Sequence, residues 1–597
     1  MPKDCKDIFL GLVLGDTENI EDNIIENFRT SNMSHVLAIS GMHISYIIMG
    51  VNLLFKKLFG YRPSKYITIF ILIIYMFVVG FSPSIVRAGI MGILTILASI
   101  TYRKSDTLTN IGLSALMLLI YNPFIIYDLG FQFSYAGTMG ILLFNKNIFN
   151  ALKSIKNQYK KSIFDNKLGE SISVIVSAQI LILIISILHY NILGIYFIIT
   201  NLLTSIIIGP IIIIGIVYVF ILIINTRLAN LVGIILNFFI KILISISNFS
   251  SLPFSKIYVT TPNFICVITY FILILLIQFL YYIYHSKKQN QTVLRSRNTI
   301  ALIKYKLKNK EKILKIIFTL FLIIFILYSI IPQNLKMNFV DVGQGDCTFI
   351  VTPKKHTILI DGGGSEFSSF DVGKSVLLPY ILDRGYTKLD YIFISHFDSD
   401  HIGGILTILK ELKVKNVIIS KQGEKNENYD EFIKIIKEKR IKLIIVEAGD
   451  KINIEKNVYI KILWPESKIV NDNILNNNSI VMKLNYNKFS CLFTGDIEET
   501  AENKITEKYL HHELKANIIK IAHHGSKTST TYSFLEEVKP KIALIGVGKN
   551  NKFGHPSDKI INLLEKQKIK IYRTDLNGEI CMQINKNGGI KINSQIK

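Results

Sequence analysis

Long apolar runs with almost no charged residues dominate the first half of the chain and most strongly limit what it can fold into. The clearest runs are Tyr66–Gly80, Ile172–His189, Ile192–Asn225, Leu228–Ile246 and Cys266–Tyr284. Each approaches or exceeds the roughly 20 residues that a helix needs to cross the hydrocarbon core of a bilayer. We therefore expect a polytopic α-helical membrane domain with roughly eight to eleven crossings.

Two apolar segments carry further expectations about the membrane helices. The run Ile192–Asn225 is long enough for two helices, and we expect a break near Gly209 and Pro210. A further crossing is expected at Ile313–Ile331, after a basic stretch.

The chain is strongly basic, and its cysteines are not spaced as pairs. Lys and Arg total 68 against 44 Asp and Glu, which gives a net charge of +24. Such an excess suits anionic partners such as lipid headgroups or nucleic acid. The five cysteines form no CxxC pair, so a disulfide framework or a thiolate zinc site is not expected.

The chain changes character after Pro332. Short β-rich runs there alternate with amphipathic helical segments, which is typical of an α/β domain. We predict a multi-span membrane domain over 1–284, a basic linker with a final transmembrane helix over 285–332, and a soluble hydrolase domain over 333–597.

Five short motifs in the soluble domain carry carboxylates and imidazoles, several of them directly after strand-like runs. They are DVGQGD (341–346), HFDSDH (396–401), TGD (494–496), HHGS (523–526) and GHPS (554–557). Such side chains at strand ends, with H-x-D-x-D-H spacing, can converge on one or two divalent ions. The ions would lower the pKa of a shared water and stabilise an anionic transition state. The motifs therefore predict a metal-dependent hydrolase.

The motifs resemble those of the metallo-β-lactamase fold, an αββα sandwich with its metals at one edge. The membrane part resembles the competence region of ComEC-type DNA-internalisation proteins. The matching membrane stretches are Gly15-Asp16, Ser34–His43, Gly80–Met91, Gly130–Ser134, and Asn201–Leu203 with Pro210. Further matches in the hydrolase part are Asn478-Ser479, GHPS (554–557) and YRTD (572–575).

This resemblance implies a channel that passes single-stranded DNA across the cytoplasmic membrane, fused to a nuclease that degrades the other strand. It also implies two partners, a DNA receptor and a cytoplasmic DNA translocase. Two alternatives stay open: a hydrolase domain that only binds DNA, and a membrane-tethered phosphodiesterase acting on envelope polymers. A β-lactam substrate fits poorly, given the membrane tether and a missing metal-site histidine.

The chain departs from the wider pattern in two ways. Members of the family usually begin with further membrane helices and an OB-like domain, whereas this chain starts inside the competence region. Dinuclear hydrolases of the fold use H-x-H-x-D-H and another histidine before the bridging aspartate. Here Asp398 replaces the second histidine, as in the ComEC-type family, and no histidine lies between His401 and Asp496.

We expect one stronger and one weaker ion site. The stronger site is assigned to Asp400, His401, Asp496 and His523, with His524 as the competing choice for the last place. The weaker site is assigned to His396 and Asp398 together with Asp496. Because carboxylates weigh heavily among these ligands, Mn²⁺ is as plausible as Zn²⁺.

The remaining polar residues of the motifs are expected to handle the substrate. We expect catalytic roles for Asp400, Asp496 and His555, with His555 and Arg573 orienting a phosphate. The residues expected to line the site are Asn478, Ser526 and Thr528. Asp361 is expected to orient a metal ligand rather than to bind the ion itself.

Three ionisable residues in the apolar half are candidate DNA contacts: Arg87, His35 and His43. Such residues are costly in a membrane and are functional by default. For His43, hydrogen bonding between helices is an equal alternative. Arg87 is expected to line the channel and contact phosphate.

Charge also predicts the topology. Residues His285–Lys312 carry nine basic residues against the single acid Glu311, so this segment is expected in the cytoplasm. The lysine-rich stretch Lys146–Lys167 is expected on the same side. The crossing Ile313–Ile331 would then place the hydrolase domain outside the cell membrane.

Overall fold

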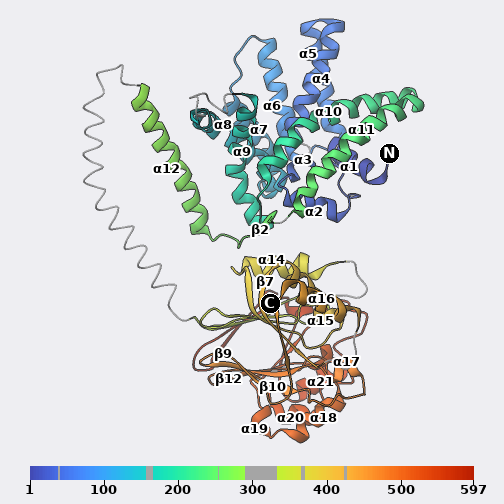
Figure 1. The fold of residues 1–597 in the computed structure, drawn as a ribbon, viewed down its shortest axis with the longest axis vertical. Coiled ribbons are helices and arrows are strands. Elements are labelled where there is room, and N and C mark those ends of the chain that lie inside the picture. Colours follow the sequence, from blue (N-terminus) through green and yellow to red (C-terminus); the bar gives the residue numbers. More distant parts are fainter. Residues whose placement is uncertain are drawn as a thin grey trace. The chain divides into compact units, whose positions relative to one another are not determined.

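The computed structural model describes residues 1–37, 41–155, 166–252, 254–289, 333–364, 370–421 and 426–596. The chain divides into two compact units, Met1–Thr292 and Val293–Lys597. Their helices and strands are labelled in Figure 1.

The first unit is built almost entirely of helices. In chain order they are α1 (Lys3–Leu14), α2 (Asp22–Thr30), α3 (Ser34–Leu37), α4 (Gly41–Phe59), α5 (Tyr61–Val78), α6 (Pro83–Ile100), α7 (Thr107–Tyr121), η1 (Pro123–Tyr127), α8 (Leu129–Ser154), α9 (Lys167–Tyr190), α10 (Phe197–Ile224), α11 (Thr226–Ser247), η2 (Asn248–Ser251) and α12 (Phe264–Gln289). Two short strands, β1 (Ile192–Gly194) and β2 (Lys256–Tyr258), pair antiparallel.

Five helices in the described ranges are long and apolar enough to cross a membrane, namely α5, α6, α9, α10 and α11. Many of their large apolar side chains are exposed, including Phe70, Phe220 and Phe238. Such surfaces are stable against lipid rather than water. The protein is therefore a multi-pass membrane protein. The predicted crossing Ile313–Ile331 lies outside the described residues.

The predicted break at Pro210 is wrong. Helix α10 runs without interruption from Phe197 to Ile224 and keeps Pro210 inside it. Proline removes one backbone hydrogen bond, but neighbouring helices of a membrane protein can satisfy the freed groups. Gly209 also packs directly against the ring of Tyr46 on α4, and this close contact supports the helix beside the proline.

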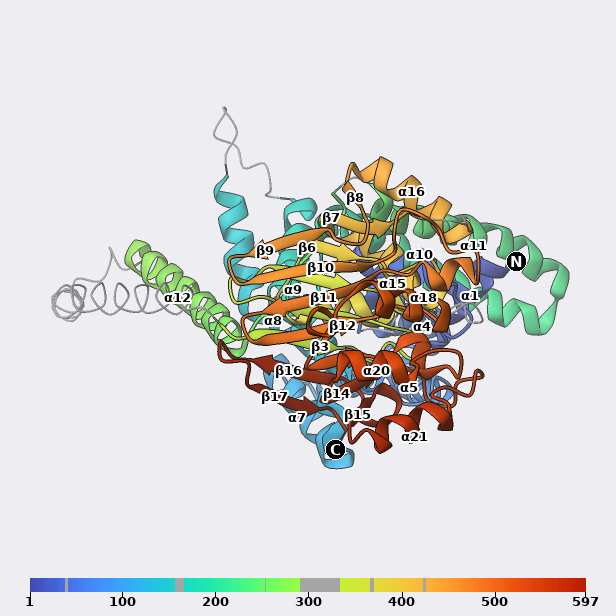
Figure 2. The same cartoon turned by 90° about the horizontal axis from the view of Figure 1, so that it is seen from below.

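The second unit contains two mixed sheets. The eight-stranded sheet has the order β17-β16-β3-β4-β5-β6-β7-β8, and the seven-stranded sheet has the order β15-β14-β13-β12-β11-β10-β9. The strands are β3 (Leu335–Phe339), β4 (Thr348–Val351), β5 (Thr357–Ile360), β6 (Lys388–Phe393), β7 (Lys413–Ser420), β8 (Lys442–Val446), β9 (Lys451–Glu455), β10 (Val458–Trp464), β11 (Val481–Tyr486), β12 (Phe489–Phe493), β13 (Ile518–Lys520), β14 (Ile542–Ile545), β15 (Lys570–Arg573), β16 (Ile580–Ile584) and β17 (Ile590–Ser594). Figure 2 shows β9, β10, β11 and β12 side by side in one sheet.

The two sheets pack face to face, and helices cover their outer faces (Figure 1). The core between them takes buried side chains from both sheets, such as Met337, Ile350, Ile460 and Leu484. The helices of this unit are η4 (Gly373–Leu377), α14 (Leu378–Asp383), α15 (Ser399–Glu411), α16 (Glu427–Lys439), α17 (Ile474–Asn477), α18 (Glu499–Lys508), α19 (His511–Leu514), η5 (Ala522–Gly525), α20 (Tyr532–Val538), α21 (Asp558–Lys566) and α22 (Thr574–Asn577). This architecture confirms the predicted αββα sandwich.

Parallel pairing brings the motif loops together. Strands β5, β6, β7 and β8 run parallel in one sheet, and β12, β13, β14 and β15 run parallel in the other. The carboxyl ends of parallel strands meet at one edge of a sheet. The loops after β5, β6, β12 and β13 carry Asp361, HFDSDH, TGD and HHGS.

Candidate functional site

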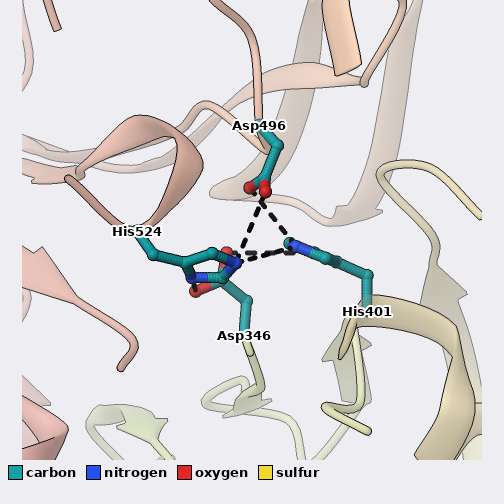
Figure 3. A group of neighbouring side chains, drawn as sticks. All are labelled: Asp346, His401, Asp496 and His524. Atoms are coloured by element: carbon teal, nitrogen blue, oxygen red, sulfur yellow. Dashed lines mark hydrogen bonds and ion pairs between the residues drawn. The ribbon is translucent and has the colours of Figure 1, made fainter. Parts of the chain in front are cut away.

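Two histidines and an aspartate form the centre of the site in the second unit (Figure 3). The Nε2 atoms of His401 and His524 lie 3.3 Å apart. Asp496 Oδ1 lies 3.3 Å from His401 Nε2, and Asp496 Oδ2 lies 3.4 Å from His524 Nε2. Asp400 Oδ2 joins them at 3.2 Å from His524 Nε2. These four residues are those predicted for the stronger ion site, with His524 in place of His523.

The second ring nitrogen of each histidine is held by an oxygen. His401 Nδ1 lies 3.0 Å from Asp361 Oδ2, and His524 Nδ1 lies 2.7 Å from the carbonyl oxygen of Gly546. A proton on each Nδ1 leaves each Nε2 with a free lone pair, as in metal sites whose histidines are oriented by a neighbouring oxygen. Asp361 thus occupies the orienting position expected from the sequence.

The spacing of these donors fits a small divalent ion. Ligand atoms about 2.0–2.1 Å from a tetrahedrally bound ion are about 3.3 Å from one another. Four of the six separations among His401, His524, Asp496 and Asp400 fall between 3.2 and 3.4 Å, with both oxygens of Asp496 taking part. Two imidazoles and two carboxylates suit Zn²⁺ or Mn²⁺. The second unit therefore carries a candidate divalent-metal site.

The buried charges of this group hold one another in ionised form. Burial alone would lower the pKa of His401 and of His524, but Asp496 and the neighbouring carboxylates hold both pKa values well above the usual range. Burial would raise the pKa of Asp496, yet His401, His524 and Lys520 hold it well below its usual range. A divalent ion would thus replace protons on the imidazoles.

Two further charged residues belong to the site and received no role from the sequence. Asp346, the last residue of DVGQGD, is 4% exposed and contributes to the buried group with His401, Asp496 and His524. Lys520, the last residue of β13, is 3% exposed and forms ion pairs with Asp346 and Asp496. Its ammonium also donates to the carbonyl oxygen of Gly495 at 2.9 Å. Lys520 therefore balances part of the charge of the buried carboxylates.

Sequence signals for both residues existed. Lys520 interrupts the apolar run Ile518–Ala522, where a charge is costly unless it is paired. The glycine before Asp346 has φ +110°, and a side chain on Gly345 would overlap the carbonyl group of Asp400. DVGQGD is therefore the loop that brings Asp346 against HFDSDH.

The residues predicted for the weaker ion site lie beside this group. His396 Nε2 is 3.4 Å from Asp398 Oδ2, and the ring of His396 is 4.2 Å from that of His401. His396 Nε2 is buried and has no hydrogen-bond partner among the residues that the structure describes. A second ion at His396 and Asp398 stays a prediction.

The backbone conformation of HHGS determines which of its two histidines faces Asp496. Both His523 and His524 have left-handed backbone, with φ of 46° and 53°, which is strained for residues other than glycine. This conformation turns His524 toward Asp496 and directs His523 Nδ1 toward Glu498 Oε1, at 3.4 Å. Of the two, His524 is therefore the one that lies beside Asp496, and which histidine binds the ion stays a prediction.

His555 lies next to His523, with ring centroids 5.7 Å apart. Partial burial, and to a lesser degree the charges of His523 and His524, lower the pKa of His555 to about 4. Its imidazole is therefore neutral at neutral pH. It can form hydrogen bonds with a substrate but carries no charge to balance a phosphate.

The other predicted substrate residues have partners of their own. Asn478 bonds to the backbone of Val470 and Ile474. Arg573 is paired with Asp575 at 2.6 and 3.0 Å. The positive charge that was expected to hold a phosphate is therefore balanced within the protein. Neither residue has a described contact with the four-donor group, so their assignment to substrate contact rests on the sequence resemblance alone.

Ser526 and Thr528 continue the HHGS loop. Their hydroxyls lie 3.0 Å apart, and Thr528 Oγ1 donates to Glu498 Oε1 at 2.9 Å. Glu498 also faces His523, so both hydroxyls belong to the polar network on the outer side of His523.

In the first unit, Arg87 on α6 is 5% exposed. Its guanidinium donates to Ser134 Oγ at 2.7 Å and to Thr138 Oγ1 at 2.8 Å, both on α8. No carboxylate of the described residues lies within ion-pair distance of Arg87. It also lies against Gly41, the first residue of the helix that carries the buried His43. His35 is exposed on α3.

A cavity of about 360 Å³ opens in the first unit. Its lining comes from four of the stretches that carry the competence resemblance, and includes Gly15, Ser34, Pro83, Ser84 and Gly130. Ser84 Oγ lies 3.2 Å from Ser134 Oγ, which accepts from Arg87. The buried guanidinium is thus one hydroxyl away from the cavity lining.

Comparison with known proteins assigns a family to each unit. The family model described as competence protein matches residues 12–282, and the metallo-beta-lactamase superfamily model matches residues 340–549. ComE operon protein 3 of Bacillus subtilis is 27% identical over 97% of this chain and 71% of its own length.

Two other relatives match about half of the chain. Recombination protein 2 of Haemophilus influenzae is 29% identical over 47% of this chain and 33% of its own length. Competence protein ComA of Neisseria gonorrhoeae is 27% identical over 44% of this chain and 34% of its own length. The chain thus spans about one third of these two relatives. The chain therefore carries a competence-protein domain in its membrane unit and a metallo-β-lactamase domain in its second unit, and it is similar to ComE operon protein 3 along both.

Proposed function

We propose that the protein is a DNA-uptake channel that passes one strand across the cytoplasmic membrane, and that its hydrolase domain is a metal-dependent nuclease that degrades the other strand. The family supplies DNA uptake as the general role. The observation that carries the nuclease is the four-donor group, in which the Nε2 atoms of two histidines lie 3.2–3.4 Å from one another and from the carboxylates of Asp400 and Asp496.

The proposed metal ligands are Asp400, His401, Asp496 and His524. A divalent ion held there would supply Lewis acidity toward an anionic phosphodiester. Asp361 and the Gly546 carbonyl keep both Nε2 atoms turned to the ion. Lys520 neutralises Asp346 and one side of Asp496, so the net negative charge does not exclude the substrate.

His555 is proposed to position the substrate. Its imidazole is neutral at neutral pH, and Nδ1 is buried without a hydrogen-bond partner among the described residues. A ring in this state can donate from one nitrogen and accept at the other. Because Arg573 is paired with Asp575, we assign the charge on the phosphate to the ion and the hydrogen bond to His555.

The conduit is proposed to pass the 360 Å³ cavity and Arg87. A buried guanidinium without a carboxylate partner in the described part of the unit favours an anion that arrives from outside. The hydroxyls of Ser134 and Thr138 hold the guanidinium in place. A phosphate of the passing strand is the anion we propose. A DNA receptor and a DNA translocase are proposed as its partners.

The nuclease is tested on the full chain, purified in detergent, with labelled single-stranded and duplex DNA, with and without Mn²⁺. We expect cleavage that requires the ion and is lost in Asp400→Ala. The matched control is Asp430→Ala, which removes an exposed carboxylate on α16. Cleavage by Asp400→Ala at the wild-type rate would contradict the proposed site. Hydrolysis of small phosphodiesters without cleavage of DNA would favour an envelope phosphodiesterase.

The hydrolase domain is proposed to lie outside the cell membrane, as the positive charge of residues 285–312 suggests. Ser467 is exposed, so Ser467→Cys introduces a thiol for labelling. The exposed Cys266 and half-buried Cys581 are replaced by serine in the same chain. An impermeant thiol reagent should label Cys at 467 in intact cells. Labelling only after lysis would place the domain in the cytoplasm.

A further inference from the structure

A line of aromatic rings leads from the surface of the hydrolase domain to the four-donor group. The ring of Phe553 is 6.0 Å from that of His555, with an angle of 16° between the planes. His555 is 5.7 Å from His523, and His523 is 6.4 Å from His524. The outermost ring, Phe553, is 54% exposed.

The loop that carries Phe553 is held in place by hydrogen bonds. Asn551 Oδ1 accepts from the backbone N–H of His555 at 3.0 Å, and Asn551 Nδ2 donates to the His555 carbonyl at 2.6 Å. The backbone N–H of Ser557 donates to the carbonyl of Gly525 in HHGS at 2.9 Å. The backbone around Phe553 is therefore held next to HHGS.

The surroundings of Phe553 are positively charged. Lys549 and Lys552 are exposed in the same loop, and Lys527 is exposed directly after HHGS. The loop 548–557 contains no acidic residue. An exposed aromatic ring beside lysines is the arrangement by which proteins bind single-stranded nucleic acid, because the bases stack on the ring and the cations attract the backbone.

We propose that Phe553 is a stacking subsite for one base of an unpaired nucleic-acid strand, with a phosphate of the same strand directed to the four-donor group. The inference rests on the proposed nuclease function and deepens it. Bases in a duplex are already stacked on their neighbours and offer no free face. Phe553 thus gives the site a preference for single strands over duplex and over phosphodiesters that lack bases.

The test compares two substrates on the full chain in detergent with Mn²⁺: a short oligothymidylate and the same sugar-phosphate chain made entirely of abasic sites. In the wild type, the bases should raise kcat/KM by about tenfold. Phe553→Ala should lower cleavage of the oligothymidylate to the level of the abasic chain and leave the abasic chain unaffected. Phe553→Trp should keep the preference for bases.

The matched control is Tyr532→Ala, which removes another exposed ring of the same domain, 57% exposed and bonded to Glu536. It should leave both rates unchanged. Equal loss on both substrates in Phe553→Ala would show that the ring only supports the loop. No loss on either substrate would show that no base contacts it.

A second readout does not require cleavage. An oligothymidylate with one 5-iodouracil is irradiated with the full chain, and the adduct is located by mass spectrometry. Crosslinking to Phe553 is expected and would stand even if the wild type cleaved no DNA, in which case the nuclease proposal alone fails. Crosslinks elsewhere but none at Phe553 would overturn the subsite. If Phe553 contacted anionic lipid vesicles and not the oligothymidylate, the ring would belong to a membrane-binding surface.

Discussion

The candidate site of each unit buries one lysine or arginine, Lys520 or Arg87, and the two differ in how their charge is balanced. Lys520 in the hydrolase domain pairs with two carboxylates, Asp346 and Asp496. Arg87 in the membrane unit contacts hydroxyls and no carboxylate of the described residues. The lysine is therefore part of a closed charge network, whereas the arginine keeps a charge that an entering anion can balance.

The two sites also differ in the sign of the charge that their own residues leave unbalanced. In the hydrolase domain, once the two imidazoles have lost their protons, the carboxylates Asp346, Asp361, Asp400 and Asp496 are balanced by Lys520 alone, so the centre favours a divalent cation. At Arg87 in the membrane unit the unbalanced charge is positive, and it favours the binding of a phosphate. In the proposed function, the cation site serves catalysis and the anion site serves the passage of DNA.

The largest expected effect concerns the membrane arginine. Arg87→Ala should reduce DNA uptake to background while protein level and nuclease activity stay at wild-type values. Arg87→Lys should keep part of the uptake, because the charge remains although the two hydroxyl contacts cannot both be made. Transformation frequency, with membrane protein quantified by immunoblot, measures this. Arg62→Ala is the control, since Arg62 is exposed and its guanidinium donates to Tyr102 Oη at 3.1 Å.

If Arg87→Ala protein disappeared from the membrane, Arg87 would be a structural ion like Lys520. The two cations would then have the same role, and the contrast between them would be wrong.

Removing the hydrolase cation should cost stability. Lys520→Met leaves Asp346 and Asp496 buried with only the imidazoles of His401 and His524 to balance them, and should destabilise the domain by about 3–5 kcal/mol. The chain has one tryptophan, Trp464, which is buried in this domain. Its fluorescence during urea unfolding therefore reports on the hydrolase domain within the full chain.

Lys508→Met is the matched control. Lys508 pairs with Glu466 at 2.7 Å, but both side chains are about 40% exposed, so its loss should cost less than about 1 kcal/mol. Equal effects of the two substitutions would show that the buried network contributes no more than a surface pair.

The two histidines of HHGS should differ in metal binding. His524→Ala removes a donor from the four-donor group and should lower Mn²⁺ affinity by more than about a hundredfold. His523→Ala removes the contacts with Glu498 and with the rings of His555 and His524 but no donor of the group, and should change affinity by less than about threefold. Calorimetric titration of the full chain with Mn²⁺ measures both. The reverse order would restore the sequence-based preference for His523.

Most of the hydrolase fold and three of its four proposed ligands could be predicted from the sequence. Asp400, His401 and Asp496 follow strand-like runs, and parallel strands bring such ends to one edge. The choice between His523 and His524 could not be predicted, because it depends on a left-handed backbone at both residues. Asp346 and Lys520 were missed because their role comes from packing between two sheets.

The membrane unit was less predictable in detail. Apolar length identified its helices, but not that α10 would continue through Pro210. Composition also cannot show that Arg87 lies against Ser134 and Thr138, because those contacts depend on how α6 packs on α8.

Metal affinity should rise with pH, by roughly ten- to hundredfold per unit around neutrality. The carboxylates hold the pKa values of His401 and His524 well above the usual range, so the metal-free imidazoles carry protons at pH 7. The ion needs neutral rings, and raising the pH lowers the cost of removing these protons. Titrations at pH 6, 7 and 8 check this. An affinity independent of pH would show that the imidazoles are not ligands.

The most direct measurement is X-ray absorption at the metal edge of the full chain loaded with one equivalent of Zn²⁺. Scattering from two imidazoles and from carboxylate oxygens at about 2.0–2.2 Å is predicted. The contribution of one imidazole should be lost in His524→Ala and kept in His523→Ala. A metal shell without histidine scattering, or one unchanged in His524→Ala, would contradict the proposed centre.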